Sequence, residues 1–406
     1  MRTLLIGLPL LALAACHFQV NGDPQRDAAT ATPVAAKPAP APAPAQADPL
    51  SSRDAVQGAA PEQQYPDAEA RPLMQAQVVL DRLGFTPGVV DGKPGLSTRN
   101  AIAGFQQANQ LIPSGSLDQP TIAALSKFNA IPATRVVTIP ADFAAGPFVP
   151  IPKSPADQAK MAGLGYQSLD EKLAERFHTT VDTLKLLNPN GVPAGVGAPG
   201  SSKSAIPAPT PMPVPTASAD AQAAPAAMFH AGQQIRVPNV GGDAIDPGAV
   251  SDTVWAQTLA TLGVGTMQPK VAKVVVSKSK GTLSAFDDAD KLVAVYTATM
   301  GSTHDPLPLG QWKVLGVSHN PKFHFNPALF WDAKSTDKKT LLPAGPNGPV
   351  GVVWIDLNIP HYGIHGTPHP ETIGRAESHG CVRLTNWDAA RLAQMVQAGT
   401  AVSFEA

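Results

Sequence analysis

Cysteine is nearly absent from this chain. The 406 residues include two, Cys16 and Cys381. Two cysteines so far apart argue against a framework of disulfides. The second lies in "SHGCVRL", residues 378–384, where His379 and Gly380 precede it and Arg383 follows two residues later. Cys381 is therefore either a small core residue or a nucleophile prepared by its surroundings.

An excess of charge of one sign is also missing. The 30 Lys and Arg residues almost balance the 31 Asp and Glu residues, for a formal net charge of −1. Nucleic-acid-binding domains carry a basic face, so no nucleic-acid partner is expected. Proline, by contrast, is frequent, with 43 residues spread unevenly. That unevenness divides the chain into segments more clearly than its length does.

The first sixteen residues, "MRTLLIGLPLLALAAC", combine an early Arg with an apolar run and small residues at its end. The run is too short to span a membrane comfortably, and the pattern is typical of a secretory signal. Leu13-Ala14-Ala15 before Cys16 resembles the bacterial lipobox, in which the cysteine becomes the lipid-bearing mature N-terminus. The alternative is a plain signal peptide in which Cys16 is incidental.

We therefore expect residues 1–16 to be a lipoprotein signal peptide and Cys16 to be lipidated. Acyl chains would hold the protein on a membrane through their buried methylenes. His17 follows Cys16, where the known inner-membrane retention signal has Asp. The resemblance thus implies a periplasmic protein anchored to the outer rather than the inner membrane.

Residues 17–70 form a Pro/Ala-rich segment that includes "KPAPAPAPAQADP". Such a composition cannot bury enough apolar surface to offset the cost of ordering it. We expect a disordered linker in which alternating Pro favours extended polyproline II, so that it acts as a spacer after the lipid anchor.

Residues 71–130 are predicted to form three helices. Apolar residues recur at helical spacing at Leu73, Ala76, Leu80 and Leu83. A second helix is expected to begin near Ser97 or Thr98, and a third after Asp118 or Gln119 with Pro120 early in it. A generic helical spacer would show the same periodicity.

The same segment resembles the small peptidoglycan-binding domain of bacterial wall enzymes, which implies peptidoglycan as a partner. The resemblance rests on Leu83-Gly84, Asp91-Gly92, Gly95, Thr98, Ala101, Phe105-Gln106 and Leu111.

Residues 150–240 are predicted to contain two amphipathic helices, a Pro/Ala-rich insert at 191–227 and a final short strand. Ser168 with Glu171 makes a capping box, and Thr180 is the expected cap of the second helix. The Asn-Pro after the second helix and the strand in "FHAGQQIRVPN" resemble a LysM module. The insert departs from that family, and no first strand is evident before Ser168.

Residues 268–405 carry several short β-branched and aromatic runs separated by turn residues, which predict successive strands. One helix is expected in "NWDAARLAQMVQAG", with Asn386 as its cap and Gly399 as its stop. The expected fold of this part is a mainly-β, β-sandwich-like domain. The whole chain is thus predicted to be multidomain: a three-helix peptidoglycan-binding domain, an α+β LysM-like segment and this mainly-β domain.

Seven of the ten histidines fall in this last domain, and "HYGIHGTPHPETIGRAESHGCVRL" holds four of them together with Cys381. A free thiol has a pKa of about 8.5 and is mostly protonated at neutral pH. A neighbouring imidazole such as that of His365 can take the thiol proton and later return it to a leaving amine. Gly366 and Gly380 allow close approach of backbone to substrate, and Arg383 can orient the loop or bind a carboxylate.

"SHGCVRL" with the upstream "IHGT" is similar to the signature of the bacterial L,D-transpeptidase catalytic domain, over about residues 270–405. The resemblance implies that Cys381 is the nucleophile and His365 the proton donor and acceptor, oriented by the carbonyl of Gly366. Ser378, His379, Gly380 and Arg383 complete the motif. It implies no metal and no organic cofactor. Leu307 in "DPLPLG" departs from the family's usual Thr, at a structural turn.

A zinc site is the rival interpretation. His361, His365 and His369 are spaced by four residues, which on a helix would align them for zinc. The intervening prolines and glycines make a helix there implausible. On a strand, His361 and His365 would lie about 13 Å apart, too far for common ligation.

The resemblance implies acyl transfer from a peptidoglycan tetrapeptide stem through a thioester on Cys381. The acceptor is the amine of a second stem or a lysine of an envelope protein. Two alternatives remain open: a carboxypeptidase or hydrolase of the same fold, in which water is the acceptor, and a non-catalytic, lipid-anchored peptidoglycan tether.

Overall fold

The computed structural model describes residues 66–195, 227–241, 245, 246, 248–376 and 378–406. All of them belong to one unit, residues 47–406. The predicted lipoprotein signal with Cys16, most of the predicted linker and most of the predicted insert lie outside the described residues. No helix in the described ranges is long and apolar enough to cross a membrane.

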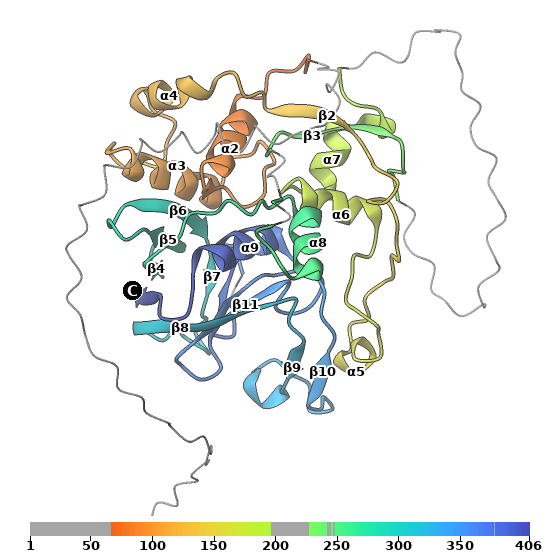
Figure 1. Ribbon diagram of the computed structural model, residues 1–406, viewed down its shortest axis with the longest axis vertical. Helices are drawn as coiled ribbons and strands as arrows, with labels where there is room; N and C mark the ends of the chain where they lie inside the picture. Colours follow the sequence, from red (N-terminus) through yellow and green to blue (C-terminus); the bar gives the residue numbers. More distant parts are fainter. Residues whose placement is uncertain (1–65, 196–226, 242–244, 247, 377) are drawn as a thin grey trace, which may run out of the picture. The chain divides into compact units, whose positions relative to one another are not determined.

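Three helices form the first module, as predicted: α2 (Pro72–Arg82), α3 (Leu96–Ala108) and α4 (Gln119–Leu125), with the 3-10 turn η1 (Ser126–Phe128) after them (Figure 1). Asp118 caps α4 by accepting a hydrogen bond from the Thr121 amide. α3 begins at Leu96, near the predicted start, but its N-cap is Gly95, so the prediction of Ser97 or Thr98 as the cap is wrong. Thr98 is buried instead, and its hydroxyl accepts a hydrogen bond from Gln77.

The buried side of α2 also differs from the predicted stripe. Leu80 is buried as expected, but Leu73, Ala76 and Leu83 are only partly covered. The remaining buried positions of the helix are Met74, Gln77, Val78, Val79 and Asp81. A helix that contacts neighbours on two sides buries more of its circumference than one apolar stripe predicts.

The middle module consists of β2 (Thr134–Thr138), α5 (Pro155–Gln158), α6 (Leu169–Arg176), α7 (Val181–Leu187), η2 (Pro189–Gly191) and β3 (Gln234–Pro238). Both predicted caps are present: Ser168 accepts from the Glu171 amide and Thr180 from the Thr183 amide. β2 and β3 pair antiparallel. The first strand missing from the sequence analysis is therefore β2, which lies before the predicted start of the module at residue 150.

The C-terminal domain is mainly β, as predicted. Its strands are β4 (Lys273–Ser277), β5 (Thr282–Phe286), β6 (Leu292–Thr297), β7 (Thr299–Met300), β8 (Gly310–His319), β9 (Phe323–Phe325), β10 (Thr340–Leu342), β11 (Val353–Leu357), β12 (Gly363–His365), β13 (Val382–Arg383) and β14 (Ala401–Glu405). The 3-10 turns η3 (Pro327–Leu329) and η4 (Pro370–Thr372) interrupt them.

Ten of the described strands make one sheet, in the order β1-β6-β5-β4-β14-β8-β11-β12-β13-β7. β4, β5 and β6 form the predicted meander. β1 (Phe85–Thr86) is a two-residue strand of the first module that pairs in parallel with β6. The sheet therefore extends beyond the domain in which we predicted it. β9 and β10 form a separate antiparallel hairpin.

Two helices pack into the core of this domain. α9 (Asn386–Met395) is the predicted one, but its cap is Thr385, not Asn386, and it ends at Met395, before Gly399. α8 (Thr253–Leu262) was not predicted. Its buried residues Trp255, Leu259 and Leu262 belong to the same core cluster as α9 and the sheet. α8 thus packs into this core although it precedes residue 268, the predicted start of the domain.

Candidate active site

Parallel pairing of β12 with β13 brings the predicted site residues together. Ile364 lies opposite Val382, and His365 lies opposite Arg383. Cys381 immediately precedes β13 and is level with Gly363, two residues before His365, so by strand alternation the side chains of Cys381 and His365 lie on the same face of the pair. The two segments are sixteen residues apart in the chain, and the sequence alone did not show that they are neighbours.

The His365 side chain is buried and oriented by the backbone. Its Nδ1 lies 2.7 Å from the carbonyl oxygen of Gly366. Because a carbonyl only accepts, Nδ1 carries the proton and Nε2 is left as the proton acceptor. The Trp354 ring stacks on the imidazole, with centroids 5.6 Å apart. Burial, with a smaller effect of the Arg383 charge, lowers the pKa of His365 to about 4.

Cys381 is partly exposed, and its Sγ lies 3.6 Å from the carbonyl oxygen of His361. Burial raises the pKa of the thiol above its usual value, while the Gly363 backbone and the Arg383 charge oppose the rise. With the histidine pKa lowered and the thiol pKa raised, the resting pair is a neutral imidazole and a protonated thiol. The neutral imidazole of His365 is thus available as a base, and the thiol of Cys381 still holds its proton.

The turn before Cys381 is held by its own polar groups. The Ser378 hydroxyl donates a hydrogen bond of 2.7 Å to the Cys381 carbonyl. Gly380 has a φ of +94°, and a Cβ there would lie 2.5 Å from Cε1 of Tyr362. Only glycine combines this backbone conformation with such close contact.

His379 belongs to a cluster that the sequence analysis missed. Its Nε2 lies 2.7 Å from Oδ1 of Asp332, and its ring contacts those of Phe330 and Trp331. These three partners lie in "LFWDA" between β9 and β10. Aromatic residues beside an Asp in a long loop are the signal that could have pointed to them.

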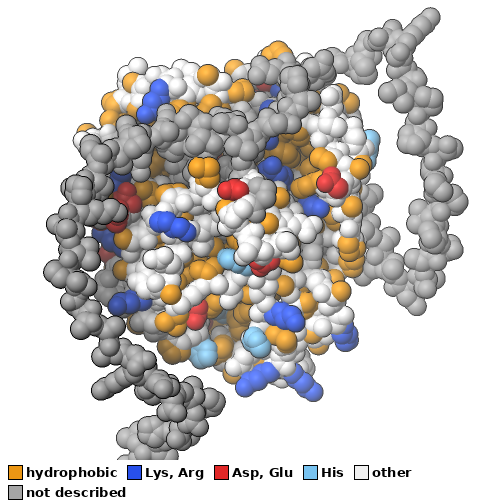
Figure 2. Space-filling model, in the orientation of Figure 1, with side chains coloured by type: hydrophobic (Ala, Val, Ile, Leu, Met, Phe, Trp, Pro, Cys, Tyr) orange, Lys and Arg blue, Asp and Glu red, His pale blue; other side chains and the backbone are white. Residues whose placement is uncertain are grey.

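Several of the predicted site residues face a cavity of about 760 Å³. Its lining includes His365, His379, Cys381 and Arg383. Part of β9, the two residues before it and the loop that follows it form one wall. Figure 2 shows lysine and histidine side chains gathered at the end of the molecule that carries β9 and β10 in Figure 1. Gly366, Ser378 and Gly380 do not line the cavity. Gly366 and Ser378 are linked to it by their hydrogen bonds to His365 and to the Cys381 carbonyl.

The histidines of the rival zinc interpretation are not grouped for ligation. His361 lies in a turn with a φ of +68°, outside β12. Within the described ranges, no cluster of three or more His, Cys, Asp or Glu side chains is arranged to hold a metal ion.

Two segments match known families. Residues 272–403 match the L,D-transpeptidase catalytic domain, and residues 71–125 match the putative peptidoglycan binding domain. The putative L,D-transpeptidase YqjB of Bacillus subtilis is 31% identical over 134 residues, which cover 32% of this chain and 68% of that protein. The chain belongs to the L,D-transpeptidase family and carries an N-terminal peptidoglycan-binding domain.

Other relatives are covered less completely. The putative L,D-transpeptidase YkuD of Bacillus licheniformis is 32% identical over 131 residues, which cover 32% of this chain and 64% of that protein. Among solved structures, an L,D-transpeptidase from Mycobacterium smegmatis has 20% identity and a TM-score of 0.27, with 33% of this chain and 58% of that one covered. The chain thus spans less than two thirds of both proteins.

Proposed function

We propose that this protein is a cysteine-dependent L,D-transpeptidase that acts on peptidoglycan tetrapeptide stems. The observation that supports the proposal is that Cys381 and His365, brought to one face by the pairing of β12 and β13, line the same cavity. Nδ1 of His365 carries a proton and donates it in a hydrogen bond to the Gly366 carbonyl. Nε2 is therefore unprotonated and suited to accept the proton of the Cys381 thiol.

In the acylation step, His365 takes the Cys381 proton and the thiolate sulfur attacks the carbonyl carbon between the diamino acid and the terminal D-Ala. The resulting oxyanion needs backbone N–H donors, and the turn at 378–381 is where we place them. The proton on Nε2 then passes to the D-Ala nitrogen. The C–N bond breaks, D-Ala leaves, and a thioester on Cys381 remains.

In the second step, an acceptor amine attacks the thioester carbonyl and gives its proton to His365. The C–S bond breaks, a new amide forms, and the thiolate recovers the proton from Nε2. We propose the side-chain amine of a neighbouring stem as the acceptor, which yields a cross-link, with a lysine of an envelope protein as the other candidate.

We propose supporting roles for the remaining motif residues. The Arg383 cation, which lines the cavity, is suited to bind a stem carboxylate. Ser378 holds the Cys381 carbonyl, and His379 ties the catalytic turn to Asp332.

We further propose that lipidated Cys16 anchors the protein in the periplasm at the outer membrane. The linker and the peptidoglycan-binding domain would then raise the local concentration of the catalytic domain at the wall polymer. The middle module, with a strand–helix–helix–strand order like that of LysM, is proposed to bind glycan as well.

The test is incubation of residues 17–406 with purified disaccharide-tetrapeptides, followed by mass spectrometry, with Cys381→Ala as the control. A dimer that lacks one D-Ala and is absent with the variant supports transpeptidation. A tripeptide without dimer would contradict stem cross-linking and favour a carboxypeptidase. No product that depends on Cys381 would favour the non-catalytic tether.

A further inference from the structure

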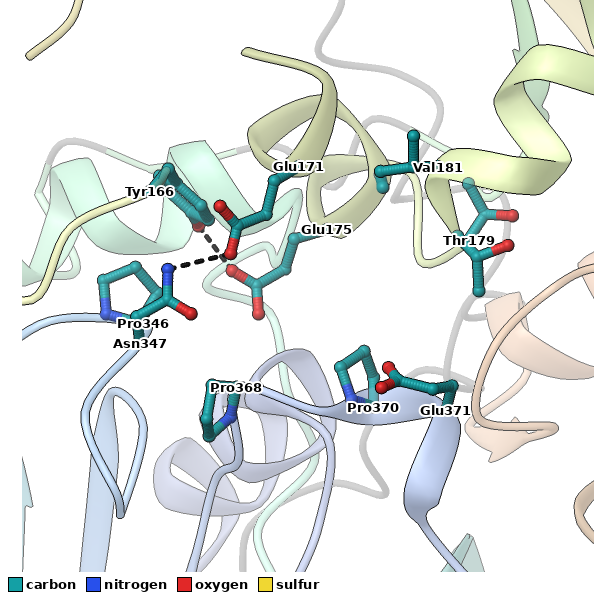
Figure 3. A pocket seen from close by; sticks show the side chains of 12 residues that line it. Tyr166, Glu171, Glu175, Thr179, Val181, Pro346, Asn347, Pro368, Pro370 and Glu371 are labelled. Atoms are coloured by element: carbon teal, nitrogen blue, oxygen red, sulfur yellow. Dashed lines mark hydrogen bonds between the residues drawn. The ribbon is translucent and has the colours of Figure 1, made fainter. Parts of the chain in front are cut away.

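A buried carboxyl group of the middle module faces the segment of the catalytic domain that follows His365. Glu175 in α6 is 8% exposed and borders a cavity of about 120 Å³ (Figure 3). Across that cavity lie Pro368 and Pro370, in the segment that follows His365. Glu175 is outside residues 272–403, the part that matches the catalytic domain.

Two hydrogen bonds hold the Glu175 carboxyl group. The Tyr166 hydroxyl donates to Oε2 at 2.5 Å, and the Asn386 amide nitrogen donates to Oε1 at 2.7 Å. Figure 3 shows the first of these, with Glu171 of the same helix turned to Asn347. Burial raises the pKa of Glu175 to about 7, although both hydrogen bonds oppose the rise.

The Asn386 side chain occupies a slot formed by two glycines of the catalytic domain. It is fully buried. A Cβ on either Gly351 or Gly366 would collide with its Oδ1. The same oxygen accepts a hydrogen bond from the Val352 amide at 3.3 Å. Asn386 therefore packs directly against Gly366, whose carbonyl holds Nδ1 of His365.

The orientation of this amide depends on its partners. With Oδ1 turned to Val352, the amide nitrogen must find acceptors on the other side, and these are Glu175 and the Pro346 carbonyl at 3.1 Å. Removing the stronger acceptor leaves a buried N–H short of a partner and allows the amide to turn or shift. Gly366 cannot follow such a shift without moving the carbonyl that orients His365.

We propose that Glu175 is a positioning residue that acts through Asn386 on Gly366 and so sets the orientation of His365. The middle module thereby contributes to the reaction itself. This inference rests on the proposed function, since it assigns Glu175 a part in the proton transfer between His365 and Cys381. A displacement of about 1 Å at a catalytic group can cost on the order of 100-fold in rate.

The variants compared in residues 17–406 are Glu175→Ala, Glu175→Met, Glu175→Gln and Tyr166→Phe. Ala and Met remove the acceptor, and Met keeps the side-chain length if the Ala variant does not fold. Gln keeps an oxygen for Asn386 and turns its NH2 to the Tyr166 hydroxyl, which can accept. Tyr166→Phe removes the other hydrogen bond of Glu175 and leaves the one to Asn386.

We expect Glu175→Ala and Glu175→Met to lower kcat at least tenfold and to leave KM within about twofold. The reason is that these changes displace the His365 imidazole and leave the substrate-binding residues in place. Glu175→Gln and Tyr166→Phe should stay within about threefold of the parent chain. Rescue by Gln distinguishes the hydrogen bond from the charge.

The second readout needs no substrate. Cys381 is the single thiol of residues 17–406, so its alkylation by iodoacetamide across pH reports the environment of the pair. In the Ala and Met variants we expect the pH midpoint of alkylation to fall toward about 8.5, the ordinary pKa of a thiol. The reason is that displacement of His365 exposes the Cys381 thiol to more solvent. If the parent chain forms no peptide product but this shift occurs, the proposed function fails and the positioning role stands. If Ala and Met change only the melting temperature, with kcat and the alkylation midpoint as in the parent, the inference is wrong.

Discussion

In the proposed mechanism, the environment of the His365 imidazole decides how this residue shares a proton with Cys381. Burial lowers the pKa of the histidine and raises that of the thiol. Both shifts oppose an ion pair in the resting site. Under the proposed mechanism, the thiolate would form only when the proton is transferred to His365 during the reaction, in contrast to a site that holds a thiolate beforehand.

We therefore expect kcat/KM for the tetrapeptide to stay high well below pH 6.5. His365, with a pKa near 4, remains a neutral proton acceptor down to about pH 5, and activity falls only as the imidazole becomes protonated below that. The measurement is a pH–rate profile of D-Ala release. An acid limb centred near 6.5 would show that the imidazole is not held in its neutral form.

Gly380 is a second residue whose identity the site requires. Gly380→Ala adds a methyl group against Tyr362 at a positive φ, so we expect kcat/KM to drop at least tenfold, as the adjacent Cys381 is displaced. The matched control is Gly399→Ala, where φ is +92° but an added Cβ meets no described atom within 4 Å. We expect both variants to lose stability through the strained φ, Gly380→Ala the more because of its contact with Tyr362, and only Gly380→Ala to lose activity. Equal activities would contradict this role of Gly380.

At the scale of single elements, α9 shows how a local signal is redirected by tertiary contacts. Thr385 and Asn386 are adjacent, and both residue types are good N-caps. The structure uses Thr385, whose hydroxyl accepts from the Asp388 amide at 3.1 Å. Asn386 is thereby available for the contacts with Val352 and Glu175.

We expect Thr385→Ala to lower the free energy of unfolding by about 1 to 2 kcal/mol, the usual cost of a lost cap. Thr385→Ser keeps the hydroxyl and should recover most of this difference. Urea denaturation followed by tryptophan fluorescence measures both. A Ser variant as unstable as the Ala variant would assign the loss to the missing methyl group and not to the cap.

At the scale of the whole described unit, a buried ionic cluster joins all three modules. Asp81 of α2 receives two hydrogen bonds of 3.0 Å from Arg391 of α9. His178, which follows α6, lies 3.1 Å from the same carboxylate and stacks on Trp387. Burial alone would raise the pKa of Asp81, but Arg391 and His178 hold it well below its usual range.

We expect Asp81→Asn to destabilise the protein by about 3 to 5 kcal/mol, because Arg391 stays buried with its main partner neutralised. The exposed Asp182→Asn is the control and should change little. Since the pKa of Asp81 is lowered by folding, its contribution is present above pH 3.8 and is lost as pH falls below that value. The melting temperature of the parent should therefore fall more steeply below pH 4 than that of Asp81→Asn. Parallel curves would contradict this account.

The sequence by itself determined the features that depend on neighbours a few residues away. These include the caps at Asp118, Ser168 and Thr180, and the three helices of the first module. The motif around Cys381 and its resemblance to the L,D-transpeptidase family were also readable, because a catalytic turn keeps its residues in a short, specific order. The expected orientation of His365 by the Gly366 carbonyl agrees with the structure for the same reason, since the two groups are adjacent.

Only the tertiary structure decided which distant segments meet. β2 was missed because its five residues become recognisable as a strand only beside β3, almost a hundred residues later. The two-residue strand β1 has no periodicity of its own, and it exists through its pairing with β6. Asp332 reaches His379, and Glu175 reaches Asn386 more than two hundred positions away. Such contacts are set by packing between segments that are distant in the chain, and this packing leaves no spacing in the sequence from which it can be predicted.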